Sequence, residues 1–407
     1  MNGELMVKKL VIIGGGFAGL RFLYNVKKHL KDNFEITLID ERKTSLEKPS
    51  LPEVAMEGKS VSKVQIPFEK IMKRGNAKFV NRSVVKISPE DQRIELDNGE
   101  SISYDYLLIA AGAVKDYNAI EGFNEYGYSV CDDVQAPRLW ERLKSFNGGR
   151  VVIGSAKTEW SNETQIPLAA PCEGPIGEIM FMVDHFLREN NLREKSSINV
   201  FTPGEIFFED VGEPVHNNLK PLIEKNGISV VTKKEISKIE AQKVRFKDGS
   251  EMESDLSIII PPYRGPEFVK ASDLGDEFGF ISTDNEMRHL KYRNIFVAGD
   301  VNNLSMPKLG HIAILQADIA FTSLRSEITG IREIKPFEPE IFCIMNRGGS
   351  EATLILSDSL FGGKHDITLT GQVAHLMKWG FDSYYYYTRG HMPPEAVQTR
   401  MEEFMKK

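Results

Sequence analysis

The sequence has few cysteines and no long hydrophobic run. Cys131, Cys172 and Cys343 are its only cysteines among 407 residues, and none belongs to a CxxC pair. This argues against a disulfide-stapled framework and against a zinc or iron–sulfur site, so we expect no metal. The longest apolar run, Leu10 to Leu20, is shorter than the roughly 20 residues that span a bilayer as a helix. We expect neither a secretion signal nor a transmembrane helix, and a cytoplasmic chain.

A surplus of basic residues is also lacking. Lys and Arg number 51 against 58 Asp and Glu, which gives a formal net charge of −7. Dedicated nucleic-acid binders are usually basic, so we expect no nucleic-acid partner. The content of 41% hydrophobic and 27% charged residues is ordinary for a globular protein and excludes a disordered or collagen-like chain. At roughly 100–200 residues per domain, the length predicts two or three domains.

Glycines near the N-terminus stand between a predicted strand and a predicted helix. The β-branched residues 11–13 lead into Gly14, Gly16 and Gly19 in GxGxxG spacing, and the next predicted strand ends at Asp40. Gly14 allows the turn, Gly16 lets the backbone approach a pyrophosphate, and Gly19 lets helix and strand pack closely. Asp40 can accept hydrogen bonds from a ribose. The pattern predicts a dinucleotide site; the alternative is a glycine-rich turn without a ligand.

Two later predicted strands end in glycine. Residues 104–113 end at Gly112 and Ala113, and residues 292–300 end at Gly299 and Asp300. Both segments resemble signatures of the flavoproteins with two dinucleotide-binding domains. The resemblance implies that the first site holds FAD, with Gly112 and Gly299 beside it and Asp300 at its ribityl chain.

The same resemblance implies a role for the helix predicted over residues 310–324. Its N-terminus at Gly310 would face the isoalloxazine ring and stabilise negative charge on the reduced ring. Lys308, just before the helix, would add a cation there.

In that superfamily, a second βαβ unit inserted in the first binds NAD(P)H through its own GxGxxG. The corresponding predicted strand, residues 150–154, ends in Gly154, but the second and third glycines are missing. A lengthened loop runs through Trp160 to Cys172 before a helix predicted through residues 181–187. We expect the second domain to keep its fold and to lose its nicotinamide site, because Trp160 and the extra residues block close approach.

These segments together predict an α/β fold of two doubly wound, parallel-sheet Rossmann-like domains, the second inserted in the first. We expect the FAD domain to comprise residues 1–115 and 275–335, and the second domain, with its degenerate NAD(P) motif, residues 116–274. Residues 336–407 would form a C-terminal region that faces the quinone and the membrane.

Four local blocks make the resemblance narrower: residues 126–131, 172–175, 261–263 and 299–310. On these blocks the chain is similar to the sulfide:quinone oxidoreductases, particularly the archaeal members, nearly from end to end. All three cysteines fall at the cysteine positions of that family. The resemblance implies oxidation of sulfide to zero-valent sulfur or polysulfide, with two electrons passing through FAD to a membrane quinone.

The family resemblance selects Cys172 and Cys343 as the pair that flanks the flavin, with Cys131 as an accessory third catalytic cysteine. Hydrosulfide would attack a disulfide beside the flavin, which is thiol–disulfide exchange with a flavin as the electron acceptor. Cys172 also precedes a predicted helix N-terminus, where a thiolate is favoured. For Glu173 two roles stay open, as a proton shuttle or as a helix-capping carboxylate.

The C-terminal segment 372–389 shows helical spacing with one apolar face. That face carries Val373, Leu376, Met377, Gly380, Phe381, Tyr384 and Tyr385, while His375, Lys378 and Asp382 lie off it. Trp and Tyr prefer the membrane–water interface, and Lys378, Arg389, Arg400, Lys406 and Lys407 can meet anionic lipid. Two readings stay open: an interfacial membrane helix, or a helix that packs its aromatic face on the core or on a partner subunit.

For the quinone or the membrane we expect five aromatic residues, Phe342, Trp379, Phe381, Tyr384 and Tyr385. The resemblance implies a peripheral protein at the cytoplasmic face of the cell membrane, and a homo-oligomer is compatible with it. The main alternative function is a type II NADH:quinone dehydrogenase, which needs the missing second GxGxxG. A soluble enzyme that reduces a cytochrome and a binding protein without turnover are further alternatives.

Overall fold

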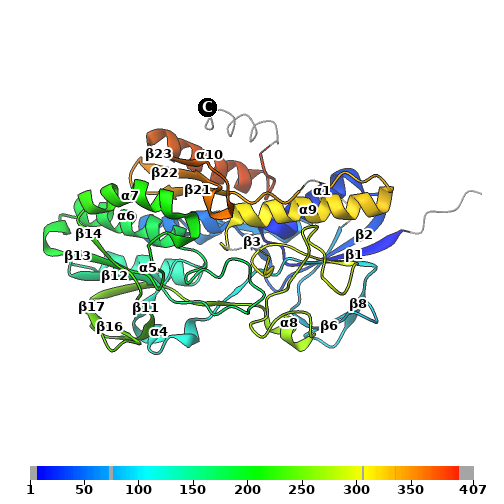
Figure 1. The fold of residues 1–407 in the computed structure, drawn as a ribbon, viewed down its shortest axis with the longest axis horizontal. Coiled ribbons are helices and arrows are strands. Elements are labelled where there is room, and N and C mark those ends of the chain that lie inside the picture. Colours follow the sequence, from blue (N-terminus) through cyan, green and yellow to red (C-terminus); the bar gives the residue numbers. More distant parts are fainter. Residues whose placement is uncertain (1–6, 73–76, 305–306, 335, 394–407) are drawn as a thin grey trace, which may run out of the picture.

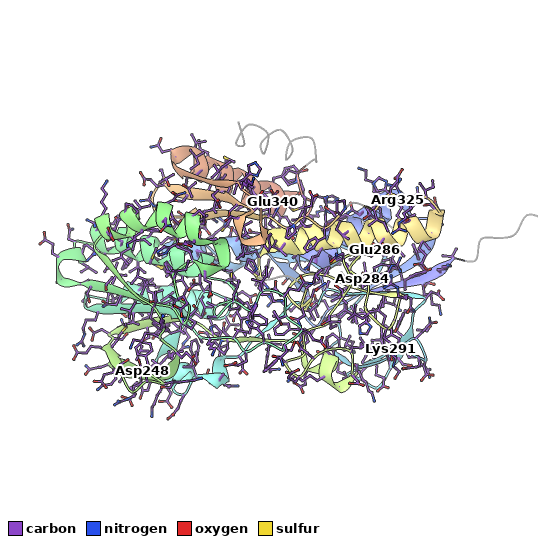
Figure 2. All side chains as sticks on the ribbon, in the orientation of Figure 1. Asp248, Asp284, Glu286, Lys291, Arg325 and Glu340 are labelled. Atoms are coloured by element: carbon purple, nitrogen blue, oxygen red, sulfur yellow. The ribbon has the colours of Figure 1, made fainter. Side chains whose placement is uncertain are left out.

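Two parallel sheets lie side by side along the long axis of the molecule, and a smaller C-terminal unit covers one side of them (Figure 1). The structure is a computed structural model, and it describes residues 7–72, 77–304, 307–334 and 336–393. Figure 2 shows the charged side chains of Asp248 and Lys291 toward the lower edge of the two halves.

The first sheet has the order β20-β9-β1-β2-β5, with every neighbouring pair parallel. Its strands are β1 (Lys8–Ile13), β2 (Phe34–Ile39), β5 (Ala77–Val80), β9 (Tyr106–Ile109) and β20 (Ile295–Val297). Helices α1 (Phe17–His29) and α9 (Gly310–Thr329) pack against each other over one face. The other face is covered by α8 (Glu267–Ala271) and the antiparallel strands β6 (Val84–Ser88), β7 (Arg93–Leu96) and β8 (Ser101–Ser103). Both faces are therefore buried, as the continuous apolar run of β1 requires.

The second sheet has the same design, with the order β11-β18-β12-β13-β14 and parallel pairing throughout. Its strands are β11 (Gly127–Tyr128), β12 (Arg150–Ser155), β13 (Ser197–Phe201), β14 (Ile228–Val231) and β18 (Leu256–Ile260). One face carries α5 (Gln135–Lys144), α6 (Gly174–Glu189) and α7 (Glu213–Lys225). The other carries β15 (Ile236–Glu240), β16 (Lys243–Phe246) and β17 (Glu251–Glu253). The α/β fold with parallel Rossmann-like sheets is confirmed.

The C-terminal unit is an antiparallel sheet with one helix. It consists of β21 (Ile341–Asn346), β22 (Ala352–Ser357), β23 (Asp366–Gly371) and α10 (Gln372–Tyr387). Strand β21 packs on α6 and α10 packs on β22, so this unit joins the second domain to the end of the chain. The remaining elements are β3 (Thr44–Leu46), α2 (Leu51–Glu57), β4 (Gln65–Pro67), α3 (Phe68–Met72), β10 (Val114–Lys115), α4 (Phe123–Tyr126), β19 (Tyr263–Arg264) and six short 3-10 turns.

Helix α10 buries two charged residues and exposes several apolar ones, which its sequence did not indicate. Its buried residues are Ala374, Lys378, Asp382 and Tyr385, whereas Val373, Leu376 and Trp379 are 61%, 63% and 65% exposed. The expectation that Lys378 meets lipid is therefore wrong, and for Tyr385 the reading that the helix packs its aromatic face on the core holds. Tertiary ion pairs hold Lys378 and Asp382 inside, and the ring of Tyr385 fills a gap beside Phe17.

Two further expectations concern the membrane. Arg389 donates a hydrogen bond to the backbone oxygen of Lys70, so its guanidinium is tied to the protein surface. Arg400, Lys406 and Lys407 lie outside the described residues. Among the helices that the structure describes, none is both long and apolar enough to cross a membrane.

Candidate active site

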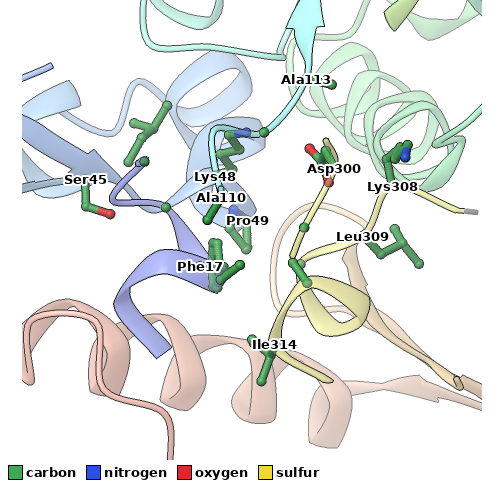
Figure 3. A pocket seen from close by; sticks show the side chains of 18 of the residues that line it. Phe17, Ser45, Lys48, Pro49, Ala110, Ala113, Asp300, Lys308, Leu309 and Ile314 are labelled. Atoms are coloured by element: carbon green, nitrogen blue, oxygen red, sulfur yellow. The ribbon is translucent and has the colours of Figure 1, made fainter. Parts of the chain in front are cut away.

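A cavity of about 1220 Å³ runs between the two domains and reaches the C-terminal unit. The predicted site residues that line it are Gly14, Gly16, Asp40, Gly112, Cys131, Cys172, Gly299, Asp300, Lys308, Gly310, Phe342, Cys343, Phe381 and Tyr384. Gly19, Trp379 and Tyr385 do not line it. Figure 3 shows Asp300 and Lys308 on one side of this cavity and Lys48 and Pro49 on the other. The structure thus brings together residues from nearly the whole length of the chain.

The glycine turn between β1 and α1 leaves no room for side chains on the protein side. A Cβ on Gly14, whose φ is +95°, would lie 2.3 Å from the backbone oxygen of Ala110. A Cβ on Gly19 would lie 1.9 Å from the backbone oxygen of Gly14, so helix and strand touch at that point. At Gly16, by contrast, a Cβ would meet no protein atom within 4 Å, because the position faces the open cavity. This is the cradle that a pyrophosphate needs at the N-terminus of α1.

Asp40 lies at the end of β2 and fixes that turn. Its carboxylate accepts hydrogen bonds from the backbone N–H groups of Gly15 (2.7 Å) and Arg42 (2.8 Å). Burial raises the pKa of Asp40, while these two hydrogen bonds oppose the rise. The lone pairs that remain can accept the ribose hydroxyl hydrogen bonds expected from the sequence.

Asp300 lies at the other end of the flavin motif, between β20 and α9. Its Oδ2 is 3.8 Å from the Nζ of Lys115. Burial raises the pKa of Asp300, but the ammonium groups of Lys115, Lys48 and Lys308 outweigh burial and hold the pKa below its ordinary value. Asp300 is therefore an ionised acceptor inside the cavity, suited to a ribityl hydroxyl.

Lys308 lies beside Asp300, just before α9. Its Nζ donates a hydrogen bond to the backbone oxygen of Asn302 (2.7 Å) and lies 4.7 Å from the centre of the Phe280 ring. Burial lowers the pKa of Lys308 to about 7, although Asp300 opposes this shift. The glycine cradle, the acid at each end and the size of the cavity all fit FAD, and these residues would hold it.

The three cysteines reach the cavity from different parts of the fold. Cys172 precedes α6, Cys343 lies on β21, and Cys131 follows β11; all three are free thiols. A Cβ on Gly174, two residues after Cys172, would lie 3.7 Å from the Sγ of Cys343. The start of α6 and the middle of β21 are thus in contact, which brings the two expected catalytic thiols together.

Burial dominates the electrostatics of these thiols. It raises the pKa of Cys172 well above its ordinary value, and the nearby carboxyl group of Asp210 adds to the rise. It raises the pKa of Cys343 to about 12. Burial also raises the pKa of Cys131, but Lys115 opposes the shift there. The thiolate that we expected at Cys172 from the helix N-terminus is not favoured, because burial raises the pKa of this thiol and the nearby carboxyl group of Asp210 adds to the rise.

That carboxylate belongs to Asp210, from the short turn before α7. Its Oδ2 accepts a hydrogen bond from the backbone N–H of Glu173 (2.7 Å), at the first turn of α6. A Cβ on Gly154 would lie 2.4 Å from the ring of Phe201, so this glycine makes room for an aromatic ring and not for a pyrophosphate. Both contacts are compatible with the expected loss of the nicotinamide site.

Trp160, which we expected to block that site, lies elsewhere. Its indole N–H donates a hydrogen bond to the backbone oxygen of Leu168 (2.7 Å), and its ring packs on Phe280 with 5.0 Å between ring centres. The sequence missed Asp210, because a carboxylate that returns to a helix start from a distant loop leaves no spacing signal.

Glu173 is the N-cap residue of α6, but its buried side chain does not bind the backbone of that helix. Its Oε2 accepts hydrogen bonds from the backbone N–H groups of Phe208 (2.7 Å) and Glu209 (3.3 Å), and it does not line the cavity. Burial, together with Asp210, raises the pKa of Glu173 to about 8. These contacts fix the segment 208–209 against the start of α6, and they do not decide between the two roles that the sequence left open.

The aromatic residues expected at the quinone separate into two groups. Phe342, Phe381 and Tyr384 line the same cavity as the cysteines. Tyr385 is 1% exposed and stacks on Phe17 with 4.7 Å between ring centres, so it is part of the core. Trp379 points outward and lies on the surface of α10.

Sequence reasoning missed a charged cluster at this end of the cavity. The Nζ of Lys378, which is 4% exposed, lies 2.7 Å from Glu53 Oε1, 3.1 Å from Asp382 Oδ2 and 3.8 Å from Glu178 Oε1. It also donates a hydrogen bond to the backbone oxygen of Pro49 (2.8 Å). Lys378, Glu178 and Asp382 line the cavity. Within the described ranges, no group of three or more His, Cys, Asp or Glu side chains is arranged to hold a metal ion.

Comparisons with known proteins agree with this geometry. The family model described as "Pyridine nucleotide-disulphide oxidoreductase" matches residues 8–158. The chain is 25% identical to the sulfide-quinone reductase of Aquifex aeolicus, over 98% of this chain and 96% of that one. The crystal structure of the sulfide:quinone oxidoreductase from Aquifex aeolicus superposes with a TM-score of 0.88 at 24% identity, covering 98% of this chain and 96% of that one. The type II NADH:quinone oxidoreductase of Staphylococcus aureus is 22% identical over 79% of this chain and 83% of its own length.

The fold and the comparisons identify an FAD-dependent flavoprotein oxidoreductase with two Rossmann-like domains. Within that class, the chain is a homologue of the sulfide:quinone oxidoreductases, as its sequence blocks and cysteine positions predict.

Proposed function

We propose that this protein oxidises sulfide to zero-valent sulfur or polysulfide and passes the two electrons through FAD to a membrane quinone. The observation that carries the proposal is the meeting of Cys172 and Cys343 in one cavity with the FAD-binding motifs. A quinone reductase that uses NADH has no need of two thiols at this place. Bound FAD supplies a two-electron acceptor next to them.

The chain's own sulfur atoms can carry the first half of the reaction. Hydrosulfide attacks a Cys172–Cys343 disulfide and leaves a persulfide on one cysteine and a thiolate on the other. The thiolate and the persulfide then join as a three-sulfur bridge, which releases one proton and two electrons. Cys131, near Lys115, is the accessory thiol at the flavin.

The second half of the reaction needs an apolar substrate to reach the same cavity. Phe342, Phe381 and Tyr384 line the end of the cavity that α10 covers, and they form our proposed quinone site. On the outer side of α10, Val373, Leu376 and Trp379 are more than half exposed. A helix with polar groups inside and apolar groups outside is suited to rest on a lipid surface. We infer a peripheral protein on the cytoplasmic face of the cell membrane.

NADH is the reductant in the alternative function, and two features oppose it. Asp210 places a carboxylate where a pyrophosphate would bind, and the ring of Phe201 lies against Gly154. Like charges at one helix N-terminus repel. The similarity of fold to NADH-dependent relatives is therefore no reason to expect that this protein uses NADH.

The test is anaerobic sulfide titration of the purified FAD-loaded protein. We expect the yellow flavin absorbance to bleach with about one sulfide per flavin, and to return when a short-chain quinone is added. Lasting yellow colour in the presence of excess sulfide would refute the sulfide assignment. Bleaching without recovery on quinone would leave sulfide as the donor and would remove quinone as the acceptor.

A further inference from the structure

The cluster around Lys378 contains more acid than its buried ammonium can balance. Four carboxyl groups belong to it: Glu53, Glu178, Asp382 and Glu47. Glu47 lies between β3 and the turn before α2, is 1% exposed, and interacts electrostatically with Asp382 and Lys378. Outside the buried group, the Nζ of Lys59 donates a hydrogen bond to Ser50 Oγ (2.7 Å).

Simple charge balance requires that this cluster holds protons. Burying a carboxylate without a partner is costly, and a buried acid in excess of its cations stays neutral instead. Burial raises the pKa of Glu47 well above its ordinary value and that of Glu178 to about 8. Burial also acts on Glu53, but Lys378 outweighs it and holds the pKa of Glu53 below its ordinary value. Glu47 and Glu178 are therefore the proton-bearing members.

Three buried oxygen atoms of the cluster indicate that it holds internal water. Glu47 Oε1, Glu53 Oε2 and Asp382 Oδ1 are buried and accept no hydrogen bond from any group in the described part of the chain. Buried polar atoms are nearly always satisfied, by ordered water where protein groups are missing. Since these atoms come from three separate segments, water between them would connect Glu47 with the groups that line the cavity.

We propose that Glu47, Glu178, Asp382 and Lys378, with water between them, form a proton store that supplies the quinone during its reduction. This inference rests on the proposed function. Hydrosulfide releases one proton and two electrons as it becomes zero-valent sulfur, whereas a quinone takes up two electrons and two protons. Each turnover therefore draws one further proton from solvent, and that proton passes through the cluster.

The arrangement gives the path a direction. Glu178, Asp382 and Lys378 line the cavity, whereas Glu47 does not and lies behind them. The charged and titratable groups that face Glu47 are Asp382, Lys378 and Tyr385 from α10 and Lys59 from the end of α2. Lys59 is half-buried and marks the side from which solvent protons enter.

The test separates the two half-reactions of the FAD-loaded protein. Sulfide reduction of the flavin and quinone oxidation of dithionite-reduced flavin are each followed by stopped flow, in H₂O and D₂O, from pH 6 to 9. In Glu47→Gln we expect sulfide reduction to be unchanged, and quinone oxidation to slow by roughly tenfold or more near pH 8, with a larger solvent isotope effect. Asp382→Asn is the second variant, and Glu209→Gln, which keeps an acceptor for the Ala169 N–H outside the cavity, is the control.

Infrared spectroscopy gives a readout apart from turnover. The oxidised wild-type protein at neutral pH should show the carbonyl stretch of a protonated carboxyl group, and Glu47→Gln should lose part of that band while Glu209→Gln keeps it. Equal quinone rates and isotope effects in Glu47→Gln and the wild type would overturn the proton store, and so would absence of the band. Failure of sulfide to reduce the wild-type flavin would instead refute the proposed donor, and the dithionite arm would still test the store.

Discussion

The carboxylate of Asp210 accepts a hydrogen bond from the backbone N–H of Glu173 at 2.7 Å, at the first turn of α6. In a dinucleotide-binding domain, this is the position at which the pyrophosphate meets the helix N-terminus. Since Asp210 occupies this position from within the chain, we expect the second domain to keep its Rossmann-like architecture without a working nicotinamide site.

NADH is therefore expected to leave the flavin oxidised on the time scale at which sulfide reduces it. Stopped-flow absorbance of the flavin with each reductant checks this. Asp210→Asn should remain unreactive toward NADH, because the Phe201 ring still lies against Gly154. NADH reduction as fast as sulfide reduction would contradict the interpretation of the second domain.

Gly16→Val should abolish FAD binding while leaving the protein folded. The new side chain would meet no protein atom at its Cβ, but it would occupy the pyrophosphate position. The measurement is the flavin-to-protein absorbance ratio, together with the thermal midpoint of the apo-protein, which should match that of wild-type apo-protein. A full complement of flavin in Gly16→Val would remove this site from the first domain.

Replacing either Cys172 or Cys343 by serine should slow flavin reduction by sulfide by about 10³-fold or more, the scale of effect expected for loss of a catalytic nucleophile. Serine changes little volume, so FAD should stay bound with its usual spectrum. Cys131→Ser serves as the matched variant and should be milder, since its role is accessory. If sulfide reduced the flavin at the wild-type rate in both the Cys172 and the Cys343 variant, these two thiols would be ordinary buried residues without a catalytic role.

The Glu173–Asp210 pair should make the protein less stable as pH rises. An unfolded glutamate loses its proton near pH 4.5, whereas burial raises the pKa of Glu173 to about 8 and that of Asp210 to about 7. Between these values the folded state binds more protons, so its stability is full below pH 4.5 and declines toward pH 8. Glu173→Gln should recover on the order of 1 kcal/mol or more at pH 8 relative to pH 5. Urea unfolding at both pH values measures this, and an unchanged pH slope in the variant would contradict it.

The exposed apolar face of α10 should govern binding to lipid. Burying one large apolar side chain contributes about 1.5–3 kcal/mol, so Leu376→Gln with Trp379→Gln should weaken binding to anionic vesicles by at least tenfold. Leu290→Gln is the control: Leu290 is 61% exposed, close to the 63% of Leu376, and its neighbour Lys291 lies on the opposite side of the molecule (Figure 2). Co-sedimentation measures both variants, and equal loss in the two would assign the effect to general hydrophobicity.

The parts of the site that the sequence predicts are those with a local physical cause. The turn at Gly14 and Gly16 has a short-range steric requirement, and the strand that leads to Asp300 is a continuous apolar run, so both can be read from neighbouring residues. The meeting of Cys172 with Cys343 depends on the family resemblance, since no spacing rule joins α6 to β21.

The sequence could not predict the burial of Lys378, because Lys378 lies off the apolar face of α10 and a lysine at such a position is usually exposed. Ion pairs with Glu53 and Asp382 decide the orientation, and one of these partners lies more than three hundred residues away. The domain limits expected from the sequence stay a prediction.

The order in which the chain is synthesised matters for this site. Strand β20 pairs with β9, although the whole second sheet is made between them, and Cys343 belongs to a unit that is made later still. Domains generally fold as units while the chain emerges from the ribosome. In this chain the first sheet stays one strand short until the second is complete, and the thiol pair cannot form before β21 emerges. In a nascent chain, Cys172 therefore has no Cys343 beside it. A flavin that binds early would lack the proposed thiol pair until β21 has been synthesised and folded.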